Sequence, residues 1–273
     1  MKRTTTYNTA RLFAACLSLL MATACSNIDE DERFIYVEPA EVQRAVLIED
    51  FTGQNCLNCP RAHETIAKLQ EQYGKDQVVA VSIHGGNMAV WTNSRMLGLR
   101  NDLGDEYNNF WGCTSWPTGM VNRKGGLSTD EQWATAVYNE IQKAPPVRIS
   151  VWTIQQTGER RYSVTVNLLA TEDYSGKLQL WITENGIVAP QRMPDGSVNA
   201  TYTHNNVLRA AANGTWGTEL RLARGEHHTD VFNFETDAEW KTENLNLVVF
   251  AYNGEGVQQA LCQQLAPSPT ESE

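Results

Sequence analysis

The sequence lacks the short motifs that mark several large enzyme classes. It contains neither the G-x-x-x-x-G-K-[ST] loop of P-loop nucleotide hydrolases nor the G-x-S-x-G turn of serine hydrolases. The apolar stretch at residues 12–22 is too short to span a lipid bilayer as a helix. No internal repeat and no low-complexity tract is present. These absences argue against phosphate-loop chemistry, serine-nucleophile chemistry and repeat architectures.

The sequence has six cysteines, of which one pair stands at C-x-x-C spacing, Cys56 and Cys59. Covalent haem attachment requires a histidine directly after the second cysteine, and Pro60 occupies that position. Cys56, Cys59 and His63 would supply three zinc ligands, but no second C-x-x-C or paired histidine follows at the spacing of a zinc site. We therefore expect neither a metal nor another cofactor.

Basic residues are outnumbered, with 22 Lys and Arg against 32 Asp and Glu and a formal net charge of −10. Residues 1–24 hold three of the basic residues and no acidic residue, so their removal leaves a net charge of −13. Such a surface repels nucleic acids and anionic lipids. We expect no nucleic-acid partner.

The first 24 residues have the form of a signal peptide, with three basic residues before the apolar stretch. Residues 20–25 read L-M-A-T-A-C and resemble the lipobox of bacterial lipoproteins, which implies that Cys25 is lipidated and anchors the chain to a membrane. The alternative is an ordinary secretory signal cut near Cys25. The acidic segment at residues 26–33 lies in a tether at residues 25–43. It is either a solvated linker or similar to the signal that sends some lipoproteins to the outer cell surface.

The stretch at residues 45–73 organises the rest of the chain. Residues 45–51 form a short apolar run that predicts a buried strand, and residues 52–55 predict a turn. From Pro60 the apolar residues recur at helical spacing up to Gly74. The C-x-x-C pair is therefore expected between a buried strand and the first turn of a helix.

This placement predicts thiol–disulfide chemistry. A helix N-terminus favours the thiolate, which is the nucleophile in disulfide exchange. We expect Cys56 to face solvent as the attacking thiol and Cys59 to be the resolving thiol. Asp50, buried near the strand end, would accept the proton of Cys59, with its pKa raised by burial. Glu49 points to the other face of the strand by alternation and is the fallback base.

The stretch resembles the thioredoxin-fold oxidoreductases, which share the strand, the acid followed by an aromatic, and the C-x-x-C at the start of a helix. A second landmark of that family, a cis proline followed by threonine, is matched by Trp116, Pro117 and Thr118. The resemblance implies a Cys56–Cys59 disulfide and a substrate-binding role for these three residues. The sequence departs from the family in having no tryptophan before Cys56, in the Leu-Asn dipeptide and in Pro60.

A second buried strand is expected at residues 78–83, and it ends at His84. Catalytic and binding groups gather at such strand ends in parallel sheets, which makes His84 a further candidate for substrate binding. The alternative is a histidine that only caps the strand end.

The domain organisation follows from a change of pattern after residue 144. We expect an α/β thioredoxin-like domain at residues 44–144 with an insertion at 87–112, then an all-β sandwich-like domain at 145–266 and a disordered tail at 267–273. The β domain is predicted from seven short strands separated by turns. They are residues 148–153, 161–169, 177–185, 219–223, 230–235, 245–252 and 257–265.

The signal, the lipobox-like Cys25, the strand and loop around Cys56 and the β region together resemble the outer-membrane-protein family named for its twenty-eight-kilodalton member. The resemblance implies a lipid-anchored outer membrane protein, at the cell surface or on the periplasmic face. Two functions remain open. One is a thiol–disulfide oxidoreductase acting on protein thiols or disulfides of the cell envelope. The other is a surface binding or adhesion lipoprotein with a structural or vestigial disulfide.

Two further cysteines, Cys113 and Cys262, are left after these assignments. An even remainder permits a bridge between them in an oxidising compartment. Two separate thiols are the favoured alternative, because sequence does not fix connectivity.

Overall fold

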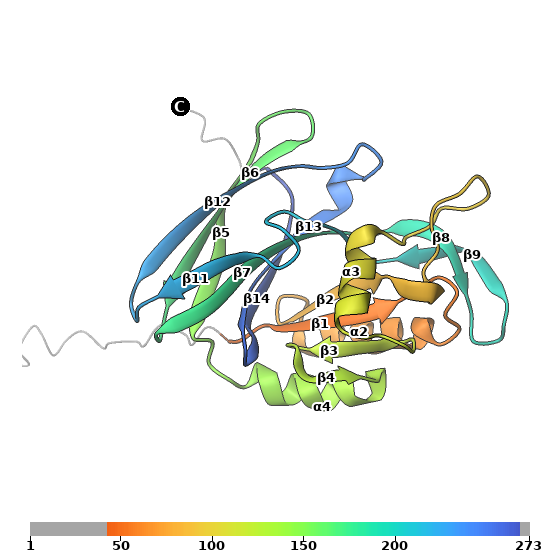
Figure 1. Ribbon diagram of the computed structural model, residues 1–273, viewed down its shortest axis with the longest axis horizontal. Coiled ribbons are helices and arrows are strands. Elements are labelled where there is room, and N and C mark those ends of the chain that lie inside the picture. The colour runs from red at the N-terminus through yellow and green to blue at the C-terminus, as the bar shows by residue number, and fades with distance from the viewer. Residues whose placement is uncertain (1–42, 268–273) are drawn as a thin grey trace, which may run out of the picture. The chain divides into compact units, whose positions relative to one another are not determined.

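The structure is a computed structural model that describes residues 43–267 (Figure 1). The predicted signal peptide, Cys25, the tether up to residue 42 and the tail from residue 268 lie outside the described residues. The described residues belong to one compact unit. None of their helices is both long and apolar enough to cross a membrane.

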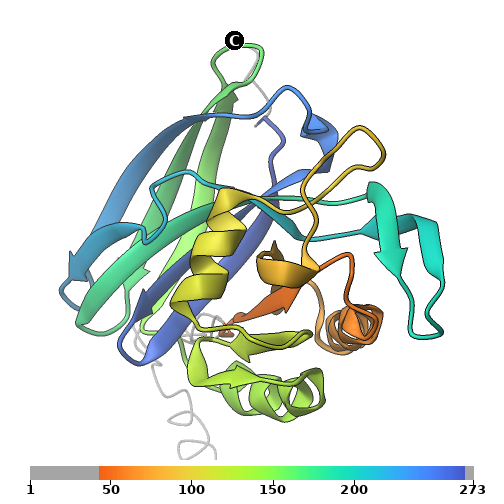
Figure 2. The ribbon, with the colours of Figure 1, turned by 45° about the vertical axis from the view of Figure 1, so that its right-hand side comes forward.

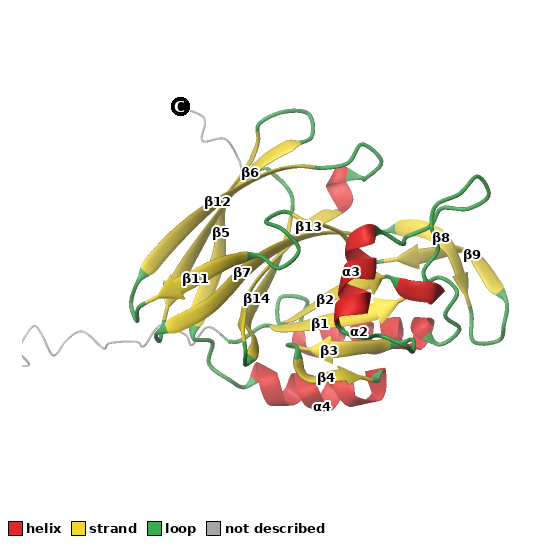
Figure 3. Cartoon of the chain, viewed as in Figure 1, coloured by secondary structure: helices red, strands yellow, loops and turns green. Residues whose placement is uncertain are grey.

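Strands predominate over helices in the described residues (Figure 3). The first half of the unit contains β1 (Val46–Thr52), α2 (Cys59–Tyr73), β2 (Val78–His84), α3 (Asp102–Phe110), β3 (Thr118–Val121), β4 (Lys124–Ser128) and α4 (Asp130–Ile141). The second half contains β5 (Val147–Gln156), β6 (Arg161–Ala170), β7 (Tyr174–Glu184), β8 (Ile187–Arg192), β9 (Val198–His204), β10 (Val207–Ala211), β11 (Thr218–Leu222), β12 (His227–Glu235), β13 (Leu245–Asn253) and β14 (Gly256–Gln264). Short 3-10 turns lie at Gly86–Met88 and Thr242–Asn244.

The predicted fold class, an α/β thioredoxin-like domain followed by a separate all-β sandwich-like domain, is wrong. One nine-stranded sheet runs in the order β14-β13-β7-β10-β2-β1-β3-β4, with β11 paired to β7, and so contains strands from both predicted domains. The two halves meet where Val207 of β10 pairs with Ser82 of β2, and the Ser82 amide donates to the Asn206 carbonyl over 2.8 Å. Residue periodicity predicts the face that a side chain takes, but not the strand that lies next to it. The described residues therefore form a continuous, β-rich fold.

At β1, different elements pack against the two faces of the large sheet. Val46 and Ile48 pack against α2 and α4, through residues such as Ile66 and Trp133. The alternate residues Leu47 and Phe51 face the other side, in a core with aromatic residues of α3, β7 and β13. The alternation along β1 thus sends Asp50 to the face that α2 covers and Glu49 to the opposite face.

The remaining strands form two smaller sheets. The three-stranded sheet β12-β6-β5 packs its apolar face, for example Val164 and Val166, against Leu180 and Val249 of the large sheet. Strands β8 and β9 form a separate hairpin (Figure 2). Cys113 and Cys262 are unpaired, so the expectation of two separate thiols is confirmed.

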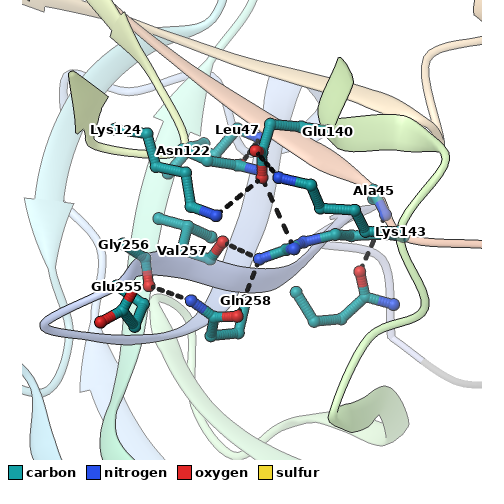
Figure 4. A network of polar contacts seen from close by, with 12 residues as sticks. Ala45, Leu47, Asn122, Lys124, Glu140, Lys143, Glu255, Gly256, Val257 and Gln258 are labelled. Atoms are coloured by element: carbon teal, nitrogen blue, oxygen red, sulfur yellow. Dashed lines mark hydrogen bonds and ion pairs between the residues drawn. The ribbon is translucent and has the colours of Figure 1, made fainter. Parts of the chain in front are cut away.

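A buried polar network around Glu140 of α4 ties the start of β1 to β14 (Figure 4). Glu140 accepts a hydrogen bond from Asn122 over 3.2 Å and forms ion pairs with Arg44, Lys124 and Lys143. Arg44 in turn donates to the Val257 carbonyl. Burial opposes ionisation of Glu140, but these partners outweigh it and hold its pKa below the ordinary value.

Replacing Glu140 with glutamine is expected to lower the free energy of unfolding by about 2–3 kcal/mol at neutral pH, because charged hydrogen bonds are lost. The lowered pKa means that the wild-type advantage is present above the ordinary carboxyl pKa and is lost as the pH falls through the folded-state value. Urea unfolding of both proteins between pH 3 and pH 7 measures this. The matched change Glu131→Gln, at an exposed carboxylate 3.4 Å from Arg61, should have little effect, and a pH-independent loss in Glu140→Gln would contradict the expectation.

Candidate active site

The C-x-x-C pair lies where β1 ends and α2 begins. Cys56 and Cys59 are joined in a disulfide, which confirms the predicted pairing. Helix α2 starts at Cys59 with Pro60 in its first turn, a position where proline fits because that amide needs no helical partner. Gly53 leaves room for the neighbouring backbone, since a Cβ atom there would lie 2.3 Å from the Met88 carbonyl carbon. The strand, the turn and the helix therefore stand where the sequence predicts them.

Cys56 is buried beside the β8–β9 hairpin, so the expectation that it faces solvent is wrong. Its exposed fraction is 3%. The side-chain amide of Gln191 in β8 donates to the Cys56 carbonyl over 2.9 Å, and the Arg192 amide donates to the Gln54 carbonyl over 2.8 Å. These bonds fix the end of β8 to the disulfide loop.

Gln54 fixes the same loop from the other side. Its buried side chain accepts a hydrogen bond from the Leu99 amide over 2.9 Å and donates to the carbonyls of Leu97 and Pro190, each over 3.0 Å. One glutamine thus joins the disulfide loop to the 89–101 segment and to β8. These hydrogen bonds hold the disulfide loop in place.

Asp50 lies on the face of β1 that α2 covers and is completely buried. Its Oδ2 atom lies 3.4 Å from Nε2 of His63, which is one helical turn beyond Cys59. Burial raises the pKa of the Asp50 carboxyl, and the contact with His63 offsets part of that increase. A buried carboxyl with a raised pKa is a stronger base than an exposed one, which suits it to accept a proton from a neighbouring group.

His63 is a site residue that the sequence presents only as a metal ligand. Its Nε2 atom also lies 3.0 Å from Oγ1 of Thr52, and its Nδ1 atom lies 2.9 Å from the Tyr202 hydroxyl in β9. The available signal was its spacing of four residues from Cys59, which places both on one face of α2. Tyr202 carries no short-range signal, because its place depends on the hairpin.

His84 lies beside this site but away from the surface. It pairs with Thr52 in the sheet, and its ring centroid lies 5.6 Å from that of His204 in β9. Burial, assisted by the neighbouring histidines, lowers the pKa of His84 well below its ordinary value and that of His204 to about 4. Both rings are neutral at pH 7, and a substrate-binding role for His84 stays a prediction.

The predicted cis-proline segment borders the same strand end. The Trp116–Pro117 peptide bond is cis, as predicted. Thr118 pairs with Phe51, and Gly119 pairs with Asp50, in antiparallel register. Trp116 and Pro117 are half-buried, while Thr118 is buried. The structure therefore brings the segment next to Asp50, whereas its contact with a substrate stays a prediction.

The described residues contain no group of three or more histidine, cysteine, aspartate or glutamate side chains arranged to hold a metal ion. The histidines near Asp50 do not converge on one point. The ring centroids of His63 and His204 are 6.4 Å apart, and the two ring planes meet at 73°. The chemistry that this site offers is thiol, carboxyl and imidazole chemistry.

Known families and solved structures similar to this chain indicate the family to which it belongs. The family model described as outer membrane protein Omp28 matches residues 104–269. The solved structure of HBP35 of Porphyromonas gingivalis has a TM-score of 0.63 and 17% identity, over 85% of this chain and 78% of that chain, which shows a shared fold alone. A domain of the outer membrane lipoprotein Omp28 from Porphyromonas gingivalis has a TM-score of 0.33 and 18% identity, over 46% of this chain and 93% of that chain. No curated protein sequence matches the chain significantly.

Proposed function

Because the chain belongs to the outer membrane protein Omp28 family, and is thus a protein of the outer membrane, we propose that it acts there as a lipid-anchored thiol–disulfide oxidoreductase. The observation that carries the proposal is the Cys56–Cys59 disulfide at the first turn of α2, with the buried Asp50 on the strand beneath that helix. Its partners would be protein thiols or disulfides of the cell envelope.

The proposed exchange is reversible and needs no cofactor. In the oxidising direction, a substrate thiolate attacks Sγ of Cys56, the Cys56–Cys59 bond breaks, and the Cys59 sulfur leaves as a thiolate that takes the proton of Asp50. A second substrate thiolate then attacks the substrate sulfur of the mixed disulfide and releases Cys56 as a thiolate. The substrate has lost two electrons to the C-x-x-C pair. In the reducing direction, Asp50 takes the proton of Cys59.

One observation favours the second candidate, a binding or adhesion lipoprotein with a structural disulfide. Cys56 is 3% exposed under the β8–β9 hairpin, and a nucleophile must be reached by its substrate. The oxidoreductase proposal therefore requires the hairpin to leave Sγ of Cys56 accessible during exchange.

Trapping variants separate the two candidates. Cys59→Ser removes the resolving thiol, so Cys56 is expected to accumulate in mixed disulfides with envelope proteins, seen as bands that disappear on reduction. Cys56→Ser is the matched control and should trap nothing. Wild-type protein should also oxidise or reduce a model dithiol peptide. Equal, negligible trapping by both variants together with an inert wild type would reject the oxidoreductase and leave the binding lipoprotein.

The lipid anchor is tested by a separate change. Cys25→Ala is expected to move the protein from the membrane fraction to the soluble fraction, because the acyl chains supply the membrane affinity. Labelled palmitate should enter the wild type and not the variant. Wild-type protein without label would reject Cys25 as the anchor.

A further inference from the structure

We propose that His63 carries the proton between the buried Asp50 carboxyl and solvent, through the Tyr202 hydroxyl at the edge of an open groove. The inference rests on the proposed exchange function and adds a positioning and proton-transfer residue to it. It concerns how the proton that Asp50 exchanges with Cys59 enters and leaves a site from which water is excluded.

The contacts form a continuous path outward from Asp50. Nε2 of His63 lies 3.4 Å from Oδ2 of Asp50, and Nδ1 of the same ring lies 2.9 Å from the Tyr202 hydroxyl. The side chain of Asp50 is 0% exposed, whereas that of His63 is 18% exposed. One ring nitrogen therefore faces the buried carboxyl and the other faces the half-buried Tyr202, as a proton-transfer imidazole requires.

The outer end of the path opens into a groove. His63 and Tyr202 line a hollow of about 860 Å³ between α2 and the segment after β9, together with polar residues such as Glu64, Asn205 and Asn206. The hollow is large enough to hold water molecules, and polar side chains form part of its lining. A proton that reaches Tyr202 is thus at the edge of an open groove.

The other histidines near Asp50 are not equivalent to His63. The ring centroid of His204 lies 6.4 Å from that of His63, and the ring centroid of His84 lies 5.6 Å from that of His204. Burial lowers the pKa of both, so they resist taking a proton. Asp130, which pairs with Arg61, faces Asp50 from the start of α4 and favours its protonated form. Among the described residues, the imidazole that contacts Asp50 is that of His63.

The transfer balances without another reactant. Neutral His63 receives a proton from Asp50 at Nε2 and releases its Nδ1 proton toward the Tyr202 hydroxyl and groove water. The reverse sequence returns a proton to Asp50. Thr52, whose hydroxyl oxygen lies 3.0 Å from Nε2, keeps the ring oriented in both states.

The test compares disulfide exchange with a dithiol peptide in wild type, His63→Gln and His63→Ala between pH 5 and pH 9. Glutamine keeps hydrogen bonding but does not transfer a proton, so His63→Gln should be about 10²-fold slower near pH 7, the lower end for a positioned acid–base group. Adding imidazole should restore the His63→Ala rate in proportion to its concentration and leave wild type unchanged. His228→Gln is the matched control, since that histidine lies 3.1 Å from Asp230 on the distant strand β12, and it should behave like wild type.

The outcomes separate the two proposals. Active wild type with equally active His63 variants would overturn the proton path and leave the oxidoreductase standing. Slow variants with an unchanged pH profile and no imidazole rescue would make His63 structural, and would also overturn the path. A wild type without exchange would overturn both proposals.

Discussion

Replacing Arg123 with methionine is expected to lower the free energy of unfolding by about 3–5 kcal/mol, because Glu49 would remain buried without a partner. The guanidinium now contacts both carboxylate oxygens of Glu49, with Nε–Oε2 and Nη2–Oε1 distances of 2.9 Å. The side chains are 4% and 0% exposed. Water cannot replace the lost partner at such a depth.

The cost should be large because Arg123 joins several elements. Its guanidinium lies 4.5–5.7 Å from the centroids of four aromatic rings, which belong to Trp111, Trp181, Phe250 and Tyr252. A buried cation over aromatic faces gains further attraction. One side chain from the β3–β4 turn thus connects β1 to β7 and β13 of the large sheet.

Urea unfolding of three variants measures the effect. Glu49→Leu/Arg123→Met removes both charges and should recover much of the stability lost in Arg123→Met. Arg161→Met is the matched control, because it also removes an arginine from an ion pair, here 3.6 Å from Glu235, while both side chains are exposed (72% and 57%), and it should cost less than about 1 kcal/mol. A double variant no more stable than Arg123→Met would show that aromatic packing, not the ion pair, is what Arg123 supplies.

For the Glu49–Arg123 pair, the face of β1 is predictable from the sequence and the partner is not. Alternation along β1 correctly separates Glu49 from Asp50, since period two is a local property. The partner of Glu49 stands 74 residues later and has no local signal. The turn that presents it is formed by Asn122 and Arg123, with φ of 51° and 56°, a two-residue hairpin turn. Gly125 and Gly126, which follow this turn, lie in β4.

The strands also differ in whether local sequence predicts them. All seven strands expected after residue 144 exist, close to their predicted bounds, because each carries its own apolar alternation. The prediction omits β8, β9 and β10; most residues of β9 are exposed, so this strand has no buried apolar face. Strand β10 joins β7 to β2 in the large sheet, and local sequence carries no signal for that connection.

The candidate site was predictable where it depends on neighbours in sequence. The disulfide, the buried Asp50 and the cis Pro117 follow from short motifs. The cover over Cys56 and the Tyr202 contact to His63 were not predictable, because both come from a hairpin about 130 to 140 residues away along the chain.

Replacing Asp50 with asparagine is expected to stabilise the folded protein by about 1–3 kcal/mol at neutral pH, because a buried carboxyl without a full set of hydrogen bonds is removed. Burial raises the folded-state pKa of Asp50 above its ordinary value of 3.8, so the folded protein holds this proton to higher pH than the unfolded chain. The carboxyl therefore costs no stability at low pH, and its cost grows as the pH rises through the folded-state pKa. The gain from asparagine should be near zero at pH 3–4 and increase toward pH 7.

The same variant should lose function while it gains stability, since asparagine cannot accept the proton of Cys59. Exchange with a dithiol peptide near pH 7 is expected to slow by about 10²-fold, without a change in the far-ultraviolet circular dichroism. Asp105→Asn is the matched control with the opposite sign. That carboxylate lies 3.0 Å from Arg100 and is part-exposed, so its removal should cost about 0.5–1 kcal/mol at pH 7 and leave exchange unchanged. If Asp50→Asn were less stable than wild type at pH 7, the buried carboxyl would be a stabilising group. That result would reject the assignment of Asp50 as a proton acceptor whose ionised form destabilises the fold.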